Sequence, residues 1–435
     1  MKILLILLDN GTNVNSFPLG IGYLVSTAQS RGYKDITIYN QEVYHYEDSE
    51  ITKFLDANKF DLIGLGIYGY HQYRKAINLC KHIDASKNKP LLVLGSHGPT
   101  AEPEHFLKKM NADVVVMGEG EIVFCNLLDA LSSAAPLSTI KGIAYREGEN
   151  IFINEREAVI KDIDTLSYPA WDMFPMEHYV LGRQIAANKT DRCMSVVSSR
   201  GCMYSCNFCF RMYKGYRLRD VGNVIEEIKK LIRDYHVTFI IFEDENLTGT
   251  KERVYRFAEA MIKADLSVRW SCHGRLRVAT PDILDMMKRA GCVYINYGIE
   301  SLDQKVLDLM DKHQTVEEAF IGVENTIKAG ICPGLNVLWG NLGDTKESLQ
   351  KAKEFLNKYN VGIWVRNIKP VTPYPGAPLF NISVERGLLK DAGDFYKKYS
   401  NSDKMTVNFT DISDEEFYKL LFEANKEILS VYYRK

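Results

Sequence analysis

Three cysteines close together constrain this chain more than any other feature. Cys202, Cys206 and Cys209 follow the spacing C-x3-C-x2-C, and no fourth cysteine lies nearby. Iron–sulfur clusters are held by cysteine thiolates, commonly four, so this short run favours a [4Fe–4S] cluster whose fourth iron stays open to a small molecule. A structural zinc site would usually take four protein ligands in two separated pairs. A disulfide would need an oxidising compartment.

The run from Ser199 to Cys209, SRGCMYSCNFC, resembles the signature of the radical S-adenosylmethionine (SAM) superfamily. In that superfamily the amino and carboxylate groups of SAM bind the open iron. One electron then cleaves SAM to methionine and a 5′-deoxyadenosyl radical, which abstracts a substrate hydrogen. The resemblance implies that the three cysteines are the metal ligands. Phe208 matches the aromatic residue usual before the last cysteine, at the cofactor, and core packing is its alternative role.

The composition is that of an ordinary globular protein. The chain has 435 residues, 46% hydrophobic and 25% charged, with a net charge of −2. The length suggests two or three domains, and the charge provides no general basic field for nucleic acid. A local basic stretch, Arg211–Arg219, follows the cysteines. It would either meet an anionic substrate or form a solvated loop.

The chain carries no sign of membrane insertion or export. No apolar run reaches the roughly 18–20 residues that a membrane helix needs. The N-terminal MKILLILLDN is too short for a signal sequence and fits a buried strand better. The remaining cysteines have no paired spacing, which fits a reducing cytoplasm. They are Cys80, Cys125, Cys193, Cys272, Cys292 and Cys332.

The first 135 residues predict a doubly wound, Rossmann-like α/β domain. Short apolar runs alternate there with helical patterns, and runs without polar alternation indicate strands buried on both faces of a parallel sheet. The expected strands are 2–8, 36–39, 62–67, 91–94 and 114–117. Residues 136–192 are expected to hold a β-hairpin (140–145 and 151–153) and a linker without a clear period.

A second βα series begins at Cys193. Six βα units between 193 and 394 predict a partial (β/α)6 barrel, whose chemistry belongs at the carboxyl ends of its strands. The expected strands are 195–198, 239–242, 268–272, 293–299, 335–340 and 363–371. Residues 395–435 are expected to form a tail with a terminal helix at 415–432.

Further motifs of the superfamily match residues in this half. The resemblance implies that Glu243, Asp244 and Glu245 meet the SAM amino group, where negative charge is favourable at short range. An acidic helix cap is the alternative. Glu300 and Ser301 belong to a segment, Tyr-Gly-Ile-Glu-Ser, that resembles a ribose-binding motif.

Two later segments are similar to motifs of the cobalamin-type branch. Asn341 lies in Gly-Asn-Leu-Gly-Asp-Thr, where relatives often carry a proline at the position of Leu342, and is implied to bind cofactor. Residues 372–378, TPYPGAP, form a proline-stiffened turn. The catalytic residues are not identified from the sequence. Candidates are His273, Arg275 and Tyr297, with a structural role as the alternative for His273.

The N-terminal half resembles the cobalamin-binding domain that is fused to many radical SAM enzymes. Its glycine-rich turns follow strands, where the backbone approaches a bulky planar ligand. The implied cobalamin contacts are Gly95, Ser96, Gly118, Glu119 and Gly120. Many cobalamin carriers place a cobalt-ligating histidine after the first strand, but residues 8–14 contain none, and His97 is not in the ligand position.

The resemblance implies a cytoplasmic cobalamin-dependent radical SAM methyltransferase with a [4Fe–4S] cluster, SAM and cobalamin. The radical would strip hydrogen from an unactivated carbon, which then takes a methyl group from methylcobalamin. An alternative is a non-methylating enzyme on the same scaffold (ring contraction, cyclisation or dehydration), with or without cobalamin. A third is a cofactor-binding sensor or carrier. Expected partners are a small-molecule or natural-product substrate and a flavodoxin- or ferredoxin-type electron donor. The sequence does not name the substrate.

Overall fold

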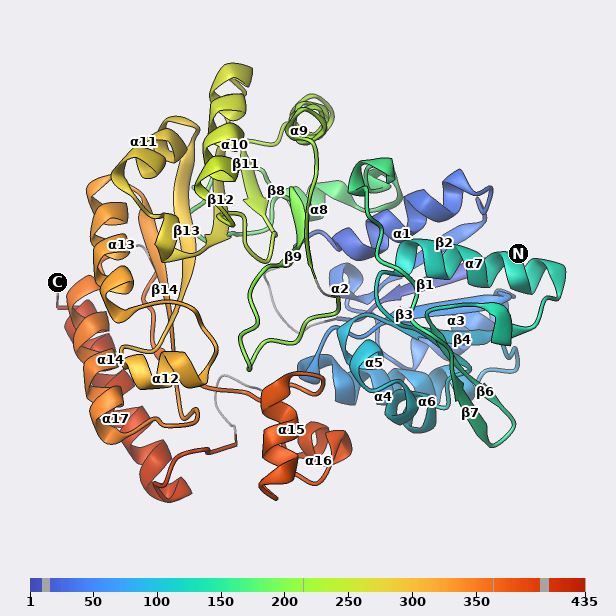
Figure 1. Cartoon of the computed structure of the whole chain (residues 1–435). Helices are drawn as coiled ribbons and strands as arrows, with labels where there is room; N and C mark the ends of the chain where they lie inside the picture. The colour runs from blue at the N-terminus through green and yellow to red at the C-terminus, as the bar shows by residue number, and fades with distance from the viewer. Residues whose placement is uncertain (10–15, 214, 363, 400–406, 435) are drawn as a thin grey trace. The chain divides into compact units, whose positions relative to one another are not determined.

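A computed structural model describes the chain except for residues 10–15, 214, 363, 400–406 and 435. The chain divides into two compact units, each described below by itself (Figure 1). The first unit comprises Met1–Tyr179 and Leu389–Asn401. The second comprises Val180–Leu388 and Ser402–Lys435. None of the described helices is long and apolar enough to cross a bilayer.

The first unit is built on a seven-stranded sheet in the order β2-β1-β3-β4-β5-β6-β7. The five strands from β2 to β5 run parallel, and β6 and β7 are antiparallel additions. The strands are β1 (Ile3–Leu7), β2 (Ile36–Asn40), β3 (Leu62–Gly66), β4 (Leu91–Gly95), β5 (Val114–Val116), β6 (Ile143–Glu147) and β7 (Asn150–Ile153). β1 is buried along its whole length, as a strand covered on both faces must be.

Helices cover both faces of this sheet, so the predicted doubly wound domain is confirmed. On one face α1 packs against α7, where Val25 and Phe124 join Ile3 and Leu5 in the core. On the other face α4 packs against α3 and α6 (Figure 1). The helices of the unit are α1 (Leu19–Ser30), α2 (Gln41–Tyr44), α3 (Glu50–Ala57), α4 (Tyr70–Asp84), α5 (His97–Ala101), α6 (Pro103–Met110), α7 (Gly120–Ser133) and α16 (Ala392–Lys398), with α8 (Met176–Val180) at its boundary.

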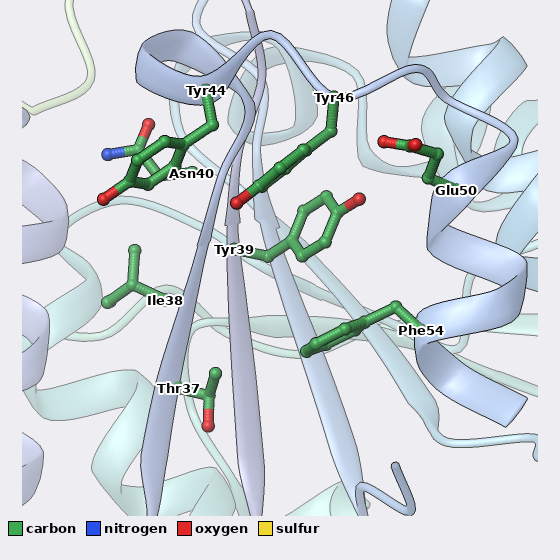
Figure 2. A pocket seen from close by; sticks show the side chains of 8 residues that line it. All are labelled: Thr37, Ile38, Tyr39, Asn40, Tyr44, Tyr46, Glu50 and Phe54. Atoms are coloured by element: carbon green, nitrogen blue, oxygen red, sulfur yellow. The ribbon is translucent and has the colours of Figure 1, made fainter. Parts of the chain in front are cut away.

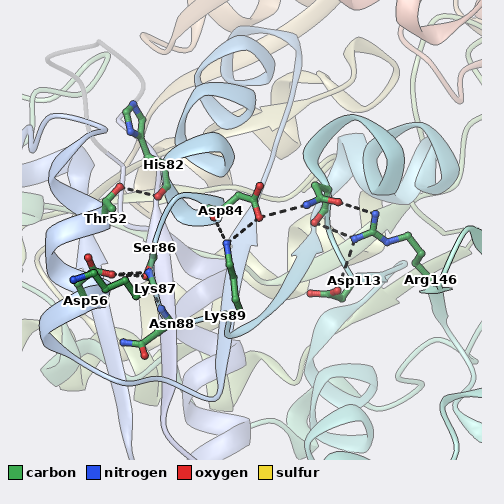
Figure 3. A network of polar contacts seen from close by, with 11 residues as sticks. Thr52, Asp56, His82, Asp84, Ser86, Lys87, Asn88, Lys89, Asp113 and Arg146 are labelled. Atoms are coloured by element: carbon green, nitrogen blue, oxygen red, sulfur yellow. Dashed lines mark hydrogen bonds and ion pairs between the residues drawn. The ribbon is translucent and has the colours of Figure 1, made fainter.

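A polar network closes the amino-terminal ends of the central strands in this unit (Figure 3). Asp56 accepts a hydrogen bond from the Ser86 hydroxyl at 3.0 Å. Arg146 donates to the Asn111 amide oxygen at 2.7 Å and lies 3.9 Å from Asp113. Asp113 in turn accepts from the backbone N–H of Leu92 at 2.8 Å. These contacts tie the connections before β4 and β5 to β6.

The second unit contains a six-stranded, all-parallel sheet in the order β8-β11-β12-β13-β14-β15. Its strands are β8 (Cys193–Val196), β11 (Phe239–Phe242), β12 (Arg269–Gly274), β13 (Cys292–Glu300), β14 (Cys332–Trp339) and β15 (Ile368–Pro370). Within the described residues β8 and β15 do not pair with each other. The sheet is therefore an open, partial (β/α)6 barrel, as predicted.

Helices α11, α13, α14 and α17 lie on the outer face of the curved sheet, and several helices of this unit begin at recognisable caps (Figure 1). Thr315 and Thr345 each start a helix with a capping box, and Pro281 opens α11. The ring of Phe417 in the last helix stacks on Trp339 with centroids 4.4 Å apart. The helices are α9 (Val221–Tyr235), α10 (Lys251–Ala264), α11 (Pro281–Arg289), α12 (Gln304–Leu309), α13 (Val316–Lys328), α14 (Lys346–Tyr359), α15 (Pro378–Glu385) and α17 (Asp414–Tyr432).

Three features differ from the sequence-based expectations. The hairpin β6–β7 is continuous with the first sheet because β6 pairs with β5. The cysteine run forms a further hairpin, β9 (Ser199–Cys202) with β10 (Gly215–Leu218). Helix α16 belongs to the first unit because Tyr396 stacks on Tyr73 at 4.4 Å, a contact between distant residues that no local pattern signals. The four-part division of the chain stays a prediction, since compactness does not test which segments fold as domains.

Candidate functional site

The cysteine loop leaves the carboxyl end of β8 and is tied to the barrel by its middle residue, Asn207. Asn207 donates from its backbone N–H to Met310 O at 2.9 Å and from its amide to Leu309 O at 2.8 Å. Its own carbonyl accepts from Leu379 N–H at 2.9 Å. Ser205 adds a hydrogen bond to Asp311. The loop that carries the three thiols is therefore held by α12 and α15, not free in solvent.

Two cations lie beside these thiols. Arg275 donates from Nη2 to Cys206 Sγ at 3.1 Å, and its guanidinium stacks 3.6 Å from the ring centroid of Tyr204. A hydrogen bond from the Cys209 thiol lowers the pKa of Cys206, and the charges of Lys312 and Arg275 lower it further. The thiolate is the form that ligates metal, so this surrounding suits a cluster ligand.

The three thiols of the loop are not gathered around one point in the described structure. Across the part of the chain that the structure describes, no three histidine, cysteine or acidic side chains gather in the way that holds one metal ion. Cysteines that bind a cubic cluster ligate different iron atoms and so need not converge on one point. Cys206 is buried, Cys202 is partly exposed and Cys209 is exposed, so the loop faces open space on one side.

Glu300 and Lys312 form a buried ion pair next to the cysteine loop. Lys312 Nζ lies 2.8 Å from Glu300 Oε1, and the two side chains are 5% and 10% exposed. A Cβ at Gly298 would lie 2.7 Å from Lys312 Nζ, so a larger residue there would displace the ion pair. Glu300 itself has a φ of +62°, a strained conformation for a residue with a side chain. Ser301 is buried and its hydroxyl accepts from Asp303 N–H at 3.2 Å.

The three acidic residues after β11 separate into two kinds. Asp244 is buried and accepts hydrogen bonds from the Ser198 backbone and from the hydroxyls of Ser198 and Ser199. Its carboxylate is thus occupied in holding the start of the cysteine loop. Glu243 and Glu245 are exposed, and Glu243 accepts from Ser195 Oγ at 3.2 Å. These two carboxylates are the ones that can meet a cationic amine.

Asn341, after β14, contains an unused hydrogen-bond donor. Its backbone N–H donates to Asp344 at 2.9 Å, and its amide oxygen accepts from Leu342 N–H at 2.7 Å. Its amide nitrogen is buried and has no hydrogen-bond partner. A buried donor left unpaired is costly, so this position fits a ligand acceptor at the carboxyl edge of the barrel.

The three candidate catalytic residues have different surroundings. Arg275 contacts the cysteine loop, as described above. His273 is half-buried on β12, and its Nδ1 lies 3.2 Å from the Asn296 amide nitrogen. Tyr297 is 1% exposed and its hydroxyl bonds to Thr326 of α13 at 3.0 Å. It therefore points to the helical layer, and the structure does not bring it to the other site residues.

In the first unit, glycines leave the carboxyl ends of three adjacent strands bare. Gly66 ends β3, Gly95 ends β4 and Gly118 follows β5. A Cβ added to any of them would meet no atom closer than 3.8 Å. Backbone without side chains at neighbouring strand ends lets a large planar ligand such as a corrin approach closely. We call these three glycines the glycine shelf.

The other predicted contacts of this edge are placed as follows. Ser96 has a φ of +77° directly after β4, and Gly118 has a φ of +90°. Glu119 is held by a hydrogen bond from Ile160 N–H at 2.9 Å, and Gly120 begins α7. The ring of His97 contacts that of Tyr68 at 4.4 Å, and burial lowers the pKa of His97 to about 4. The position of the missing cobalt ligand, within residues 8–14, lies mostly outside the described residues.

An aromatic cavity of about 360 Å³ opens at the outer edge of the same sheet (Figure 2). Tyr39, Tyr46 and Phe54 surround it, with Tyr39 5.0 Å from Tyr46 and 5.1 Å from Phe54 between ring centroids. None of its lining residues belongs to the glycine shelf, and none was predicted to bind a cofactor.

Sequence reasoning missed two residues that support the cysteine loop and Glu300 at the barrel edge. Lys312 lies outside every motif noted above, yet it neutralises Glu300. Asn207 lies inside the cysteine motif but was given no role there, and it anchors the cysteine loop. A lysine twelve residues after a buried glutamate carries no local signal. Asn207, between two of the cysteines, could have been considered as an anchor.

Comparisons with known proteins agree with this arrangement. The Radical SAM superfamily model matches residues 196–356, and the B12 binding domain model matches residues 13–128. An uncharacterized methyltransferase, PH0819, of Pyrococcus horikoshii is 27% identical over 98% of this chain and 91% of its own length. The anaerobic magnesium-protoporphyrin IX monomethyl ester cyclase of Rubrivivax gelatinosus is 26% identical over 87% of this chain and 68% of its own length.

Two solved structures share the fold. TsrM from Kitasatospora setae, a radical SAM methyltransferase with cobalamin and a [4Fe–4S] cluster bound, superposes with a TM-score of 0.70 at 15% identity, covering 89% of this chain and 75% of TsrM. OxsB, a cobalamin-dependent SAM radical enzyme, superposes with a TM-score of 0.69 at 18% identity. That match covers 99% of this chain and 56% of OxsB, so the chain spans just over half of that larger enzyme.

Proposed function

Because this chain belongs to the cobalamin-dependent radical SAM family, in which a B12 binding domain precedes a radical SAM domain, we propose that it is a C-methyltransferase acting on a small-molecule substrate. The family uses a [4Fe–4S] cluster, SAM and cobalamin. One observation carries the proposal: the two family models match in tandem, and the methyltransferase relative aligns with almost the whole chain.

When bound, the cluster and SAM supply a 5′-deoxyadenosyl radical, and cobalamin supplies the methyl group. The chain's own residues bind, orient and shield these groups. We assign cluster ligation to Cys202, Cys206 and Cys209. Arg275 holds the Cys206 thiol through the 3.1 Å contact and stabilises its thiolate.

We assign SAM binding to the carboxyl edge of the barrel. Glu243 and Glu245 present exposed carboxylates to an amine, and the orphaned amide of Asn341 presents a donor. Glu300 is fixed by Lys312 at 2.8 Å, which leaves its second carboxylate oxygen for a ribose hydroxyl. Phe208 and Ser301 complete this set. On the other unit, the glycine shelf with Ser96, Glu119 and Gly120 would receive the corrin.

The proposal is tested by anaerobic reconstitution with iron, sulfide and hydroxocobalamin, followed by reduction in the presence of SAM. Iron absorption near 400 nm together with corrin bands is expected. Methyl transfer yields both S-adenosylhomocysteine and 5′-deoxyadenosine, because one SAM donates the methyl group and another forms the radical. Protein that binds neither cofactor would overturn the proposal.

A second function is favoured by one specific observation, the likeness to a cyclase over 87% of this chain. A non-methylating enzyme on the same scaffold would produce 5′-deoxyadenosine without S-adenosylhomocysteine. Product analysis of a single turnover separates the two.

We further propose a flavodoxin- or ferredoxin-type electron donor and a cytoplasmic location. The six scattered free cysteines support the location.

A further inference from the structure

A cluster of five polar residues occupies the inner face of the barrel sheet, the face opposite to the helices. It comprises His273 of β12, Tyr294 and Asn296 of β13, Asn336 of β14, and Arg366 just before β15. A Cβ at Gly334 of β14 would meet both the Tyr294 hydroxyl and the Asn296 amide, so these groups share one face. Tyr297, of the opposite parity, points to α13. We call this set the inner cluster.

The hydrogen bonds of the inner cluster fix which atoms are donors. Asn296 Oδ1 accepts from Asn336 Nδ2 at 2.9 Å, from Arg366 Nη2 at 3.0 Å and from Tyr294 OH at 3.3 Å. The amide nitrogen of Asn296 therefore donates to His273 Nδ1 at 3.2 Å. The proton of a neutral His273 then resides on Nε2. Burial lowers the pKa of His273, and the charge of Arg366 lowers it further, so the ring stays neutral.

Arg366 is a cation without a counter-charge in the described part of the chain. Its guanidinium donates only to the neutral Tyr294 hydroxyl and Asn296 amide. Its Nε is buried and has no hydrogen-bond partner, and it forms none of the ion pairs among described residues. Glu243, which follows β11 beside β12, instead accepts from Ser195. Arg366 is half-buried, and withdrawing part of a charge from water without a counter-charge is unfavourable, which makes Arg366 a poor choice for a purely structural position.

We propose that the inner cluster binds an oxyanion of the substrate, a carboxylate or a phosphoryl group, through Arg366 and His273 Nε2–H. This rests on the proposed function in one respect: the bound molecule is taken to be the substrate of the barrel enzyme. The groups that the cluster would turn toward an anion, the Arg366 guanidinium and His273 Nε2–H, are donors, and the acceptor Asn296 Oδ1 is already used by three donors. A planar guanidinium matches the geometry of carboxylate and phosphoryl oxygens.

The test uses the full-length protein and two probes, inorganic phosphate and acetate, titrated by calorimetry. Arg366→Gln is compared with Arg233→Gln, which removes an exposed arginine paired with Asp234 at 2.7 Å. Loss of a charge-assisted contact is expected to weaken binding of the preferred probe about 10–100-fold in Arg366→Gln and to leave it unchanged in Arg233→Gln. Preference between phosphate and acetate identifies the class of oxyanion. Equal affinities in wild type and Arg366→Gln would overturn the proposal.

A second variant separates binding from a structural role. Arg366→Met removes the charge and keeps the length of the side chain, while Asn296 keeps two of its donors. If Arg366 serves to bind an anion and not to stabilise the fold, the melting temperature of Arg366→Met should equal or exceed that of wild type. A clear fall in melting temperature with unchanged anion binding would show a structural arginine and overturn the proposal.

SAM cleavage by wild-type protein without substrate is measured in parallel. If this cleavage is absent, the proposed function fails, whereas the anion titration still decides whether the inner cluster binds an oxyanion.

Discussion

The two units build their candidate binding edges from opposite materials. In the first unit the glycine shelf offers backbone without side chains, and the charged groups beside it are held by backbone contacts, as Arg156 is by Thr100 O and Glu119 by Ile160 N–H. In the barrel unit the edge is made of charged and thiol side chains packed against one another, such as Lys312 with Glu300 and Arg275 with Cys206. Binding at the glycine shelf should therefore be lost when a side chain is added, and binding or stability at the barrel edge should be lost when a side chain is removed.

The same contrast holds between the two ends of the first sheet. Its amino-terminal end is closed by the network around Asp56, Asp84 and Arg146 (Figure 3). Its carboxyl-terminal end exposes glycines. Satisfied polar contacts stabilise a closed end but leave no room for a ligand, which is why function in open α/β sheets concentrates at the carboxyl ends.

Removal of a thiol from the barrel edge should have the largest effect. Cys206→Ser takes away the one buried cysteine of the loop and a thiolate that Arg275 contacts. Iron content after anaerobic reconstitution should fall to background, and SAM cleavage should be lost. Cys332→Ala, a partly exposed cysteine on β14, serves as the control and should keep full iron content. Normal iron loading of Cys206→Ser would remove it from the ligand set.

Breaking the buried ion pair should follow in size. Lys312→Met leaves Glu300 buried without a partner, which should lower the free energy of unfolding by about 3–5 kcal/mol. The matched control is Lys351→Met, whose pair with Asp303 is 42% and 26% exposed and should be worth no more than about 1 kcal/mol. Urea denaturation of both variants measures the difference. Similar losses in the two variants would mean that the buried pair of Lys312 and Glu300 contributes no more to the free energy of unfolding than an exposed pair.

Filling the glycine shelf should affect cobalamin alone. Gly95→Val places a side chain where the nearest atom is Val116 O at 3.8 Å, in a strand position that valine tolerates. Hydroxocobalamin binding should weaken at least about tenfold, or about 1.4 kcal/mol, with iron content unchanged. Gly148→Ala, in the hairpin turn with no atom within 4 Å of the added Cβ, is the control. Unimpaired corrin binding by Gly95→Val would place the corrin elsewhere.

The smallest expected effects are opposite pH dependences at the two edges. Burial lowers the pKa of His97 to about 4 in the folded protein. As the pH falls from about 6.5 to 4, His97 is protonated in the unfolded protein but not in the folded one, so its contribution to stability should be lost over this range. Burial raises the pKa of Asp344 to about 6, although hydrogen bonds from Ser348 and Asn341 oppose this. Its contribution is therefore present below about pH 4 and lost as the pH rises to 6.

Each group can change the free energy of unfolding by at most about 1.4 kcal/mol per pH unit. The difference between wild type and His97→Gln should rise with pH over this range, and the difference between wild type and Asp344→Asn should fall. Denaturant titrations at pH 4, 5 and 6 measure both slopes. Slopes of the same sign would show that one of the two groups is not buried as described.

Local patterns predicted most of the fold because they depend on neighbours in the chain. Apolar runs located β1, β3 and β11, since burial on both faces of a strand leaves a continuous apolar run in the sequence. The hairpin β9–β10 escaped prediction because Arg200, Cys202 and Gly215 do not resemble a typical strand. The residues of helix α16 were assigned to the barrel and the tail, because their partner in the first unit, Tyr73, is more than 300 residues away.

The sequence by itself determined which chemistry this chain can hold, because three cysteines at fixed spacing and glycines after strands act through local geometry. Only the tertiary structure decided how those residues are supported. Arg275 reaches Cys206, Lys312 reaches Glu300 and Arg366 reaches Asn296 across 69, 12 and 70 positions of the chain. Such pairs arise when parallel strands bring their ends to one edge, and electrostatic interactions between them depend on distance in space, which no spacing along the chain records.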